Sequence, residues 1–296
     1  MIPRRLLHCF TVVCFVGAIP ARAATAAEAD ELYRTKRYPE ARAAYEQVIA
    51  AEPGNANAAY HLGQLALMRN AAEEAAKWLE QATALTPASS PYFRALGDAY
   101  GLGAQNASFF SKLGLARKSQ AAYEKAVALD PEDLDARDSL LNFYRQAPAI
   151  AGGGTDKARA QAAEILKRDQ LRGTIALVDI DTIEKKYDDA FARLDDVLRR
   201  HPEAWIACYQ LGRTAAMSGQ RLDQGEAALR KFLTAPPAEN LPPQWAAHWR
   251  LGLIIEKKGD LAGARAEYDA ALKLNPTQPQ LLEASRRVNP PAAAGR

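Results

Sequence analysis

The chain has 296 residues, of which 48% are hydrophobic and 25% are charged, values close to the averages of globular proteins. This composition excludes collagen-like, intrinsically disordered and multi-span membrane proteins. The 38 basic and 35 acidic residues give a formal net charge of +3, and the position of this small excess decides whether it indicates a polyanionic partner.

The N-terminal segment has the pattern of a secretory signal peptide. Two arginines, Arg4 and Arg5, precede a mostly apolar run from Leu6 to Ile19, which is followed by the triplet Ala-Arg-Ala at 21–23. A basic start, a short apolar stretch and a small-residue cleavage site in this order are typical of exported proteins. We expect cleavage after Ala23 and a mature chain that is periplasmic or secreted.

Two alternatives for this segment, a membrane anchor and a lipid anchor, have weaker support in the residues. The apolar run is shorter than the ~20 residues that a spanning helix needs, and it includes His8 and Thr11. A lipoprotein signal requires a small residue directly before the modified cysteine, whereas Val13 precedes Cys14.

Cleavage would also remove the basic excess. Arg4, Arg5 and Arg22 account for the whole difference between the 38 basic and 35 acidic residues. The mature chain would have no net charge and no stripe of basic and aromatic residues. It would therefore lack the positive surface that attracts a polyanion such as a nucleic acid. We therefore expect no nucleic-acid partner and no membrane insertion after cleavage.

An internal repeat runs through the rest of the chain. Seven segments carry a small residue, an apolar residue four positions later and an apolar or small residue seven positions later, usually followed by a proline. This spacing places the three side chains on one face of a helix that the proline ends. The segments begin at Ala41, Ala75, Ser119, Ala158, Ala190, Gly225 and Ala264.

Before most of these segments lies a second helical pattern with a Leu-Gly pair or its substitute. The pairs are Leu62-Gly63, Leu96-Gly97, Leu140-Leu141, Leu177-Val178, Leu211-Gly212 and Leu251-Gly252. A glycine within a helix costs ~1 kcal/mol relative to alanine, so its recurrence predicts a neighbouring helix that needs the space of the missing side chain. Each repeat is therefore predicted to be a helical hairpin.

The pattern resembles that of the tetratricopeptide repeat family, in which a Leu-Gly pair and an aromatic residue lie on the first helix and alanine, an aromatic residue and proline lie on the second. The steps from Ala41 to Ala75 and from Pro53 to Pro87 are both 34 residues, the length of that repeat. The resemblance covers residues 25–288.

The family implies an all-α fold, a right-handed α-solenoid of about seven hairpins in which each hairpin buries its apolar face against its neighbours. We expect the solenoid over 24–288, ended by a capping helix over 278–288, and a disordered tail over 289–296. The chain departs from the family pattern at Leu141 and Val178, which replace glycine, and at Gln170, which replaces proline.

Two consecutive repeats carry extra residues at the same turn, near 103–112 and 146–155. Both insertions should therefore emerge on one edge of the solenoid. The first predicts a second helix lengthened backwards to about Ser108, which could cap it, and the second predicts a loop that ends at the helix N-cap Thr155.

The sequence leaves three interpretations of this edge open. Pro148 and Ile150 could pack over Phe109 and Phe110 and stabilise the protrusion, or the two phenylalanines and the loop could form a partner site. Alternatively, the backbone N–H groups of Gly152–Gly154, ahead of a helix N-terminus, could bind an anion.

Binding in this family generally uses the concave groove lined by the first helices. The stripe expected to face it mixes charged, aromatic and methionine side chains, which suits extended peptides or protein segments, although an ordinary solvated face is the alternative. The family's carboxylate clamp is not expected, because Asp138 stands where a lysine would be needed. The candidate partner-binding residues are Tyr60, Arg94, Asn142, Arg145, Tyr209, Arg213 and Trp249 in the groove, and Phe109 and Phe110 at the inserted edge.

The sequence contains no catalytic or metal-binding motif. His61, His201 and His248 have no second ligand at metal spacing, and Cys208 lies in an apolar helical pattern typical of an inert buried thiol. The HExxH, CxxC, GxSxG and GxGxxG motifs are absent. We therefore expect no cofactor and no enzymatic activity, and we interpret the chain as an exported bacterial scaffold or adaptor for an unidentified protein or peptide. The alternative is a small-ligand or anion-binding protein that uses the glycine loop 152–154.

Overall fold

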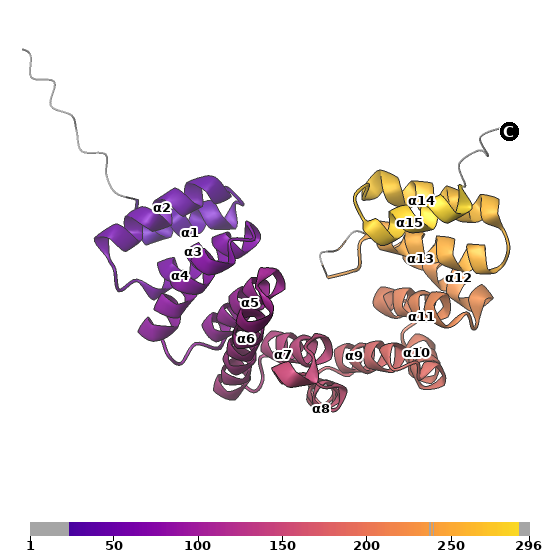
Figure 1. Cartoon of the computed structure of the whole chain (residues 1–296), viewed down its shortest axis with the longest axis horizontal. Coiled ribbons are helices and arrows are strands. Elements are labelled where there is room, and N and C mark those ends of the chain that lie inside the picture. Colours follow the sequence, from indigo (N-terminus) through magenta and orange to yellow (C-terminus); the bar gives the residue numbers. More distant parts are fainter. Residues whose placement is uncertain (1–23, 237, 239, 290–296) are drawn as a thin grey trace, which may run out of the picture. The chain divides into compact units, whose positions relative to one another are not determined.

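The computed structural model describes residues 24–236, 238 and 240–289, apart from the side chains of Asn106, Phe109 and Phe110. The predicted signal peptide, 1–23, and the predicted tail beyond Asn289 lie outside the described residues. The described part of the chain consists of α-helices and one short 3-10 helix and contains no β-strand (Figure 1). The predicted all-α fold is therefore confirmed.

The helices divide after Pro87 into two units. Unit 1 contains α1 (Ala26–Arg34), α2 (Tyr38–Ala51), α3 (Ala56–Met68) and α4 (Ala72–Leu85). Unit 2 contains α5 (Ser90–Asn106), α6 (Phe109–Leu129), α7 (Leu134–Gln146), η1 (Ala149–Ala151), α8 (Thr155–Leu166), α9 (Gln170–Ile183), α10 (Tyr187–Arg200), α11 (Trp205–Ser218), α12 (Leu222–Phe232), α13 (Gln244–Lys257), α14 (Leu261–Leu274) and α15 (Pro279–Val288).

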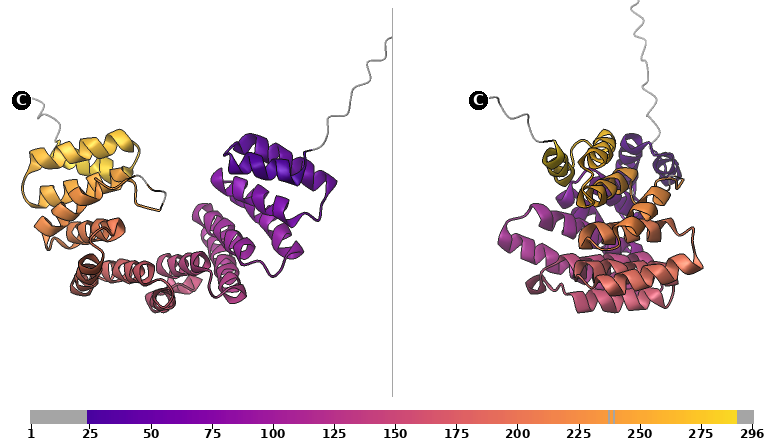
Figure 2. Two further views of the ribbon diagram at one scale, coloured as in Figure 1. Left: turned by 180° about the vertical axis from the view of Figure 1, so that it is seen from behind. Right: turned by 90° about the vertical axis from the view of Figure 1, so that its right-hand side faces the viewer.

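In the described residues, α1 to α14 pair in sequence order into the seven predicted hairpins, and α15 packs on α14 (Figures 1 and 2). The three positions of the repeat pattern are buried in every hairpin, as their helical spacing predicts. The capping helix is confirmed as well, because Leu281 and Ala284 of α15 are buried.

The glycines of the Leu-Gly pairs lie where the two helices of a hairpin are closest. A Cβ atom added at Gly63, Gly97 or Gly252 would lie 2.5 Å from a side-chain carbon of the opposing helix, a separation at which the two atoms overlap. The opposing residues are Leu79, Tyr123 and Tyr268. The predicted reason for the recurring glycine is therefore confirmed.

The turn inside most hairpins uses one residue in the left-handed backbone conformation. Lys36, Asn70, Lys185 and Gly259 have φ angles of 59°, 58°, 60° and 89°, and each stands five positions before the small residue of its repeat. Only Gly259 lacks the Cβ atom that makes this conformation unfavourable.

The two insertions change the hairpins of α5–α6 and α7–α8. The first insertion lengthens both helices, to 17 residues in α5 and 21 in α6, and not the second helix alone as predicted. Ser108 is the N-cap residue of α6, but its side chain makes no capping hydrogen bond. The prediction of Thr155 as an N-cap is wrong, because Gly154 holds that position and Thr155 is the first residue of α8.

None of the described helices combines the length and the apolar character needed to cross a lipid bilayer.

Replacing Gly252 with alanine should lower the free energy of unfolding by about 1–3 kcal/mol, because the added methyl group would overlap the ring of Tyr268. The matched control is Gly114→Ala in α6, where a Cβ would meet nothing within 4 Å. That change should stabilise the helix by about 0.5–1 kcal/mol. Urea unfolding followed by circular dichroism measures both, and equal midpoints for the two variants would contradict the close approach of α13 and α14.

Candidate functional site

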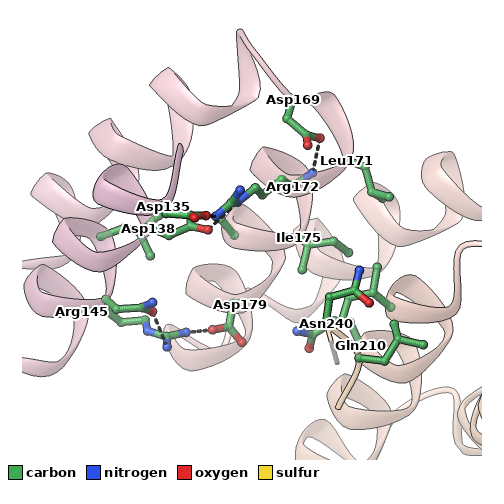
Figure 3. A pocket seen from close by; sticks show the side chains of 15 residues that line it. Asp135, Asp138, Arg145, Asp169, Leu171, Arg172, Ile175, Asp179, Gln210 and Asn240 are labelled. Carbon is green, nitrogen blue, oxygen red and sulfur yellow. Dashed lines mark hydrogen bonds and ion pairs between the residues drawn. The ribbon is translucent and has the colours of Figure 1, made fainter. Parts of the chain in front are cut away.

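The first helices of three consecutive hairpins in unit 2, α7, α9 and α11, surround a hollow of about 610 Å³ (Figure 3). The loop after α12 adds two residues to its wall. The lining residues are Asp135, Asp138, Leu141, Asn142 and Arg145 of α7, Asp169, Leu171, Arg172, Ile175, Ala176 and Asp179 of α9 and its N-cap, Ile206 and Gln210 of α11, and Asn240 and Leu241 of the loop. We call this space the groove hollow.

An acidic cluster lies where α7 and α9 begin. Arg172 donates from Nη2 to Oδ1 of Asp135 at 2.6 Å and from Nε to Oδ2 of Asp138 at 2.5 Å. The carboxylate of Asp169 caps α9 by accepting the backbone N–H of Arg172 at 2.8 Å. Arg172 lies against three carboxylates, and the charge of Arg94 also acts on Asp135. The carboxylates still outnumber the cations, which leaves an excess of negative charge at this side (Figure 3).

The protonation of the acidic cluster follows from its surroundings. The hydrogen bond from Arg172 lowers the pKa of Asp135. Burial raises the pKa of Asp138, and this effect exceeds the opposing effect of Arg172. Asp138 is therefore the weaker acid of the two and the one most sensitive to further loss of solvent.

A basic cluster lies at the other side of the groove hollow. The carboxylate of Asp179 forms ion pairs with both Arg145 of α7 and Arg213 of α11. Arg145 also donates to Oδ1 of Asn142 at 2.9 Å, and Arg213 donates to Oε1 of Gln210 at 3.1 Å. Two guanidinium groups share one carboxylate, and all three side chains are 22% exposed or less.

The excess positive charge in this cluster is partly removed from water. Burial lowers the pKa of Arg213, and burial together with the charge of Arg213 lowers the pKa of Arg145. The charge of Arg213 also acts on Arg250 of α13, whose pKa is lowered first by burial and then by that charge. Among the described residues, the buried Nε atom of Arg250 has no hydrogen-bond partner.

Apolar side chains lie between and beside the two clusters. Leu141, Ile175 and Ala176 contribute to the lining, and Leu171 of the first turn of α9 is 37% exposed. The groove hollow thus offers charges of opposite sign together with an apolar surface.

The structure brings three of the predicted groove residues together. Asn142 and Arg145 line the groove hollow, and Arg213 joins them through Asp179. Tyr60 lies in unit 1, where its hydroxyl accepts a hydrogen bond from Gln64 at 2.9 Å. Arg94 of α5 is half-buried and is not part of the lining.

The aromatic groove residues differ from the expectation of an exposed stripe. Tyr209 is only 7% exposed, because its ring packs on Phe232 with 5.2 Å between the centroids. Trp249 is half-buried and stacks on Trp245, with the guanidinium carbon of Arg250 4.3 Å from the Trp249 ring centroid. The side chains of Phe109 and Phe110 lie outside the described residues.

Sequence reasoning missed several lining residues. Arg172 and Asp179 are seven positions apart, so both lie on one face of a helix, and helical spacing along the groove stripe could have found them. No comparable signal existed for Asn240 and Leu241, which lie between two proline pairs in the connection from α12 to α13.

The glycine loop is not arranged to bind an anion. The backbone N–H groups of Gly152, Gly153 and Gly154 donate to the carbonyl oxygens of Ala149, Pro148 and Tyr144 at 2.9, 3.2 and 2.8 Å. These donors are engaged within the chain, so the structure does not support the anion-binding alternative.

Side chains that bind metal ions or react as thiols are the next groups to place in the structure. No group of three or more His, Cys, Asp or Glu side chains is placed there to hold a metal ion. Cys208 is buried, and its burial raises the pKa of the thiol, which keeps the sulfur in its less reactive protonated form.

Sequence profiles of the tetratricopeptide repeat match residues 26–90, 185–240 and 214–279, and a second profile of the same repeat matches residues 107–133. Together they cover more than half of the chain. The chain belongs to the tetratricopeptide repeat family. Tetratricopeptide repeats generally act as non-catalytic scaffolds that bind proteins or peptides.

Solved structures show the same fold. A tetratricopeptide repeat protein from Parabacteroides merdae is 14% identical, with a TM-score of 0.69 and coverage of 89% of this chain and 96% of that one. Yeast Tom70 is 13% identical, with a TM-score of 0.62 and coverage of 86% and 51%. A chain of the APC/C hetero-tetramer Cut9–Hcn1 is 14% identical, with a TM-score of 0.60 and coverage of 88% of this chain and 48% of that one. No curated protein matches the sequence.

Replacing Asp179 with asparagine should lower the free energy of unfolding by about 2–3 kcal/mol, because it leaves the half-buried charges of Arg145 and Arg213 without their shared carboxylate. Asp195→Asn is the matched control, since the carboxylate of Asp195 pairs with Arg221 at the surface and is 54% exposed. That change should cost at most about 1 kcal/mol. Similar urea midpoints for the two variants would show that the basic cluster does not depend on Asp179.

Proposed function

We propose that this tetratricopeptide repeat protein is a non-catalytic scaffold that binds an extended segment of another protein in the groove hollow between α7, α9 and α11. The observation that carries the proposal is the composition of the lining, in which two ion clusters of opposite excess charge border apolar side chains. Extended peptides present alternating polar and apolar groups that match such a surface.

The charges indicate the orientation of the segment. A basic side chain of the partner would be favoured beside Asp135, Asp138 and Asp169, where Arg172 balances only part of the negative charge. An acidic group would be favoured beside Arg145 and Arg213, which share Asp179. Because the clusters lie on opposite sides of the hollow, they would favour one direction of the bound segment and disfavour its reverse.

The scaffold is proposed to act in the bacterial cell envelope. The support is the N-terminal pattern of a basic start, an apolar run and a small-residue triplet at 21–23. The removal of Arg4, Arg5 and Arg22 would leave a protein without net charge. Its partner would therefore be selected by local groups of charged residues and not by an overall positive or negative potential.

Replacing Leu171 with aspartate should abolish capture of the groove partner, since it places a charge on the apolar wall beside the acidic cluster. The measurement is a crosslinking pull-down from the native envelope fraction, with partners identified by mass spectrometry. Leu261→Asp is the matched control, because Leu261 of α14 is exposed to 56% and lies outside the groove hollow. Partners captured equally by wild type and Leu171→Asp would refute binding in the groove hollow.

Export should yield a mature protein that begins at Ala24, because the small residues Ala21 and Ala23 fit the cleavage site of a signal peptidase. N-terminal sequencing of the protein from the periplasmic fraction and the medium measures the cleavage site. An Ala23→Phe variant should accumulate as the precursor. An uncleaved wild-type protein in the cytoplasm would contradict the envelope role while leaving the groove proposal intact.

A further inference from the structure

The basic cluster at one side of the groove hollow carries more positive charge than its own residues neutralise. Arg145 of α7 and Arg213 of α11 share the single carboxylate of Asp179. Their other hydrogen bonds go to Asn142 and Gln210, which are uncharged amides. The two arginines and the aspartate therefore leave one positive charge, in a place where none of the three side chains is more than 22% exposed.

Arg250 of α13 adds a second positive charge. Its side chain is half-buried, and among the described residues it forms no ion pair. Its guanidinium carbon lies 4.3 Å from the ring centroid of Trp249. Burial lowers the pKa of Arg250, Tyr209 opposes this effect, and the charge of Arg213 lowers the pKa further. In the described part of the chain, the groups that act on Arg250 thus include another cation and no carboxylate.

This lack of a carboxylate distinguishes Arg250 from other shielded arginines. Arg94 and Arg137 also form no ion pair within the described residues, but the charge of each acts on two carboxylates. These are Asp98 and Asp135 for Arg94, and Glu132 and Glu164 for Arg137. A charge held away from water is unfavourable unless an opposite charge lies close. The surplus beside Arg213 and Arg250 is therefore a local exception that an anion from solution would relieve.

The cluster also retains hydrogen-bond donors for such an anion. A guanidinium group has five N–H donors in one plane, which pair with two oxygens of an oxyanion. Within the described residues Arg213 donates only through Nη1, to Asp179 and Gln210. Its Nε and Nη2 atoms are not fully buried, so a ligand from solvent can reach them. Access is through the groove hollow, because Arg145, Asp179 and Gln210 line it.

The acidic cluster restricts where an anion can lie in the groove hollow. Asp135, Asp138 and Asp169 lie at the opposite side, where their charges outnumber that of Arg172. Like charges repel an anion from that side, so the basic cluster is the part of the hollow that favours one.

We propose that Arg145, Arg213 and Arg250 bind a doubly charged phosphoryl oxyanion at the basic side of the groove hollow. The three guanidinium groups and Asp179 leave two positive charges, which a phosphate dianion neutralises and a single carboxylate does not. A phosphoryl group also has enough oxygens to accept from more than one arginine. The group is either free inorganic phosphate or a phosphate ester on the partner segment, and only the second case rests on the proposed function.

The experiment titrates sodium phosphate into the purified protein by isothermal titration calorimetry at about pH 8, where phosphate is mostly a dianion. Sodium chloride at matched ionic strength is the reference. We expect saturable binding at one site in phosphate and none in chloride. The melting temperature should rise by at least about 4 °C when phosphate is present at about 100 times its dissociation constant.

Variants of Arg250 test the assignment of the site. Arg250→Gln should weaken phosphate binding at least about tenfold, because it removes one of the two surplus charges, and Arg250→Lys should lose less because it keeps the charge. Both leave the ion pairs of Asp179 in place, and circular dichroism verifies that they fold. The matched control is Arg265→Gln, which makes the same charge change at an exposed position of α14 and should bind phosphate as wild type does.

A second titration distinguishes the two sources of the phosphoryl group. O-phosphoserine that binds as tightly as inorganic phosphate, while serine does not bind, would assign the site to a phosphate ester such as a partner segment carries. Binding of inorganic phosphate alone would assign it to the free ion. Neither titration uses a peptide, so a groove hollow that captures no partner leaves the phosphate result unaffected, and absent phosphate binding leaves the pull-down result unaffected.

Several results would overturn the proposal. They are heats in phosphate no larger than those in chloride, equal phosphate affinity of Arg250→Gln and wild type, and acetate that binds as tightly as phosphate. Phosphate binding that appears only in a Glu239→Gln variant would also overturn it, because a carboxylate of the chain itself would then neutralise the arginines.

Discussion

The close approach of the two helices in each hairpin is the constraint on which the rest of the structure depends. At Gly63, Gly97 and Gly252 the opposing side chain occupies the volume that a Cβ would need. This contact sets the distance and the rotation of the paired helices, so the small and apolar positions of the second helix are buried in every repeat. The opposite face of the first helix is thereby turned outward, and side chains of successive first helices meet there to form the groove hollow.

The repeats without glycine show how the same constraint is met by other residues. Leu141 stands where a glycine is expected, and its hairpin carries Ala162 at the position held by Leu79 or Tyr123 in other repeats. Both residues are buried in one apolar cluster. In this hairpin the large side chain, Leu141, lies on the first helix and the small one, Ala162, lies on the second, the reverse of the other repeats. The total side-chain volume between the two helices is therefore conserved. The departure from the repeat pattern at Leu141 therefore changes the packing and not the fold.

The sequence predicted the parts of the molecule that depend on local periodicity. The seven hairpins, the capping helix and the role of the glycines follow from spacings within one helix, and so does the position of Asn142 and Arg145 on the groove stripe.

Tyr209 was misjudged because helical spacing places a residue near the border of a face but does not show that Phe232 of the next helix covers its ring. The ion pairs of Asp179 join three hairpins, and their geometry depends on how the hairpins stack. The sequence likewise located the insertions but could not divide the extra residues between α5 and α6. The residues on both sides of Ala107 mix helix formers with glycine and other weak helix formers, so local propensity does not mark the turn.

The left-handed residue in the hairpin turns makes the repeats energetically unequal. Lys36 and Lys185 adopt a conformation that costs a residue with a Cβ atom about 1 kcal/mol, Asn70 adopts it at a lower cost, and Gly259 adopts it freely. In a repeat protein the stability is close to a sum of terms for single hairpins and their interfaces, so this strain stays in the hairpin that carries it. The α1–α2 and α9–α10 hairpins carry this strain, the α3–α4 hairpin carries less, and the α13–α14 hairpin carries none at this position. Single turn residues therefore add to the size of the buried core in deciding where along the chain local unfolding is easiest.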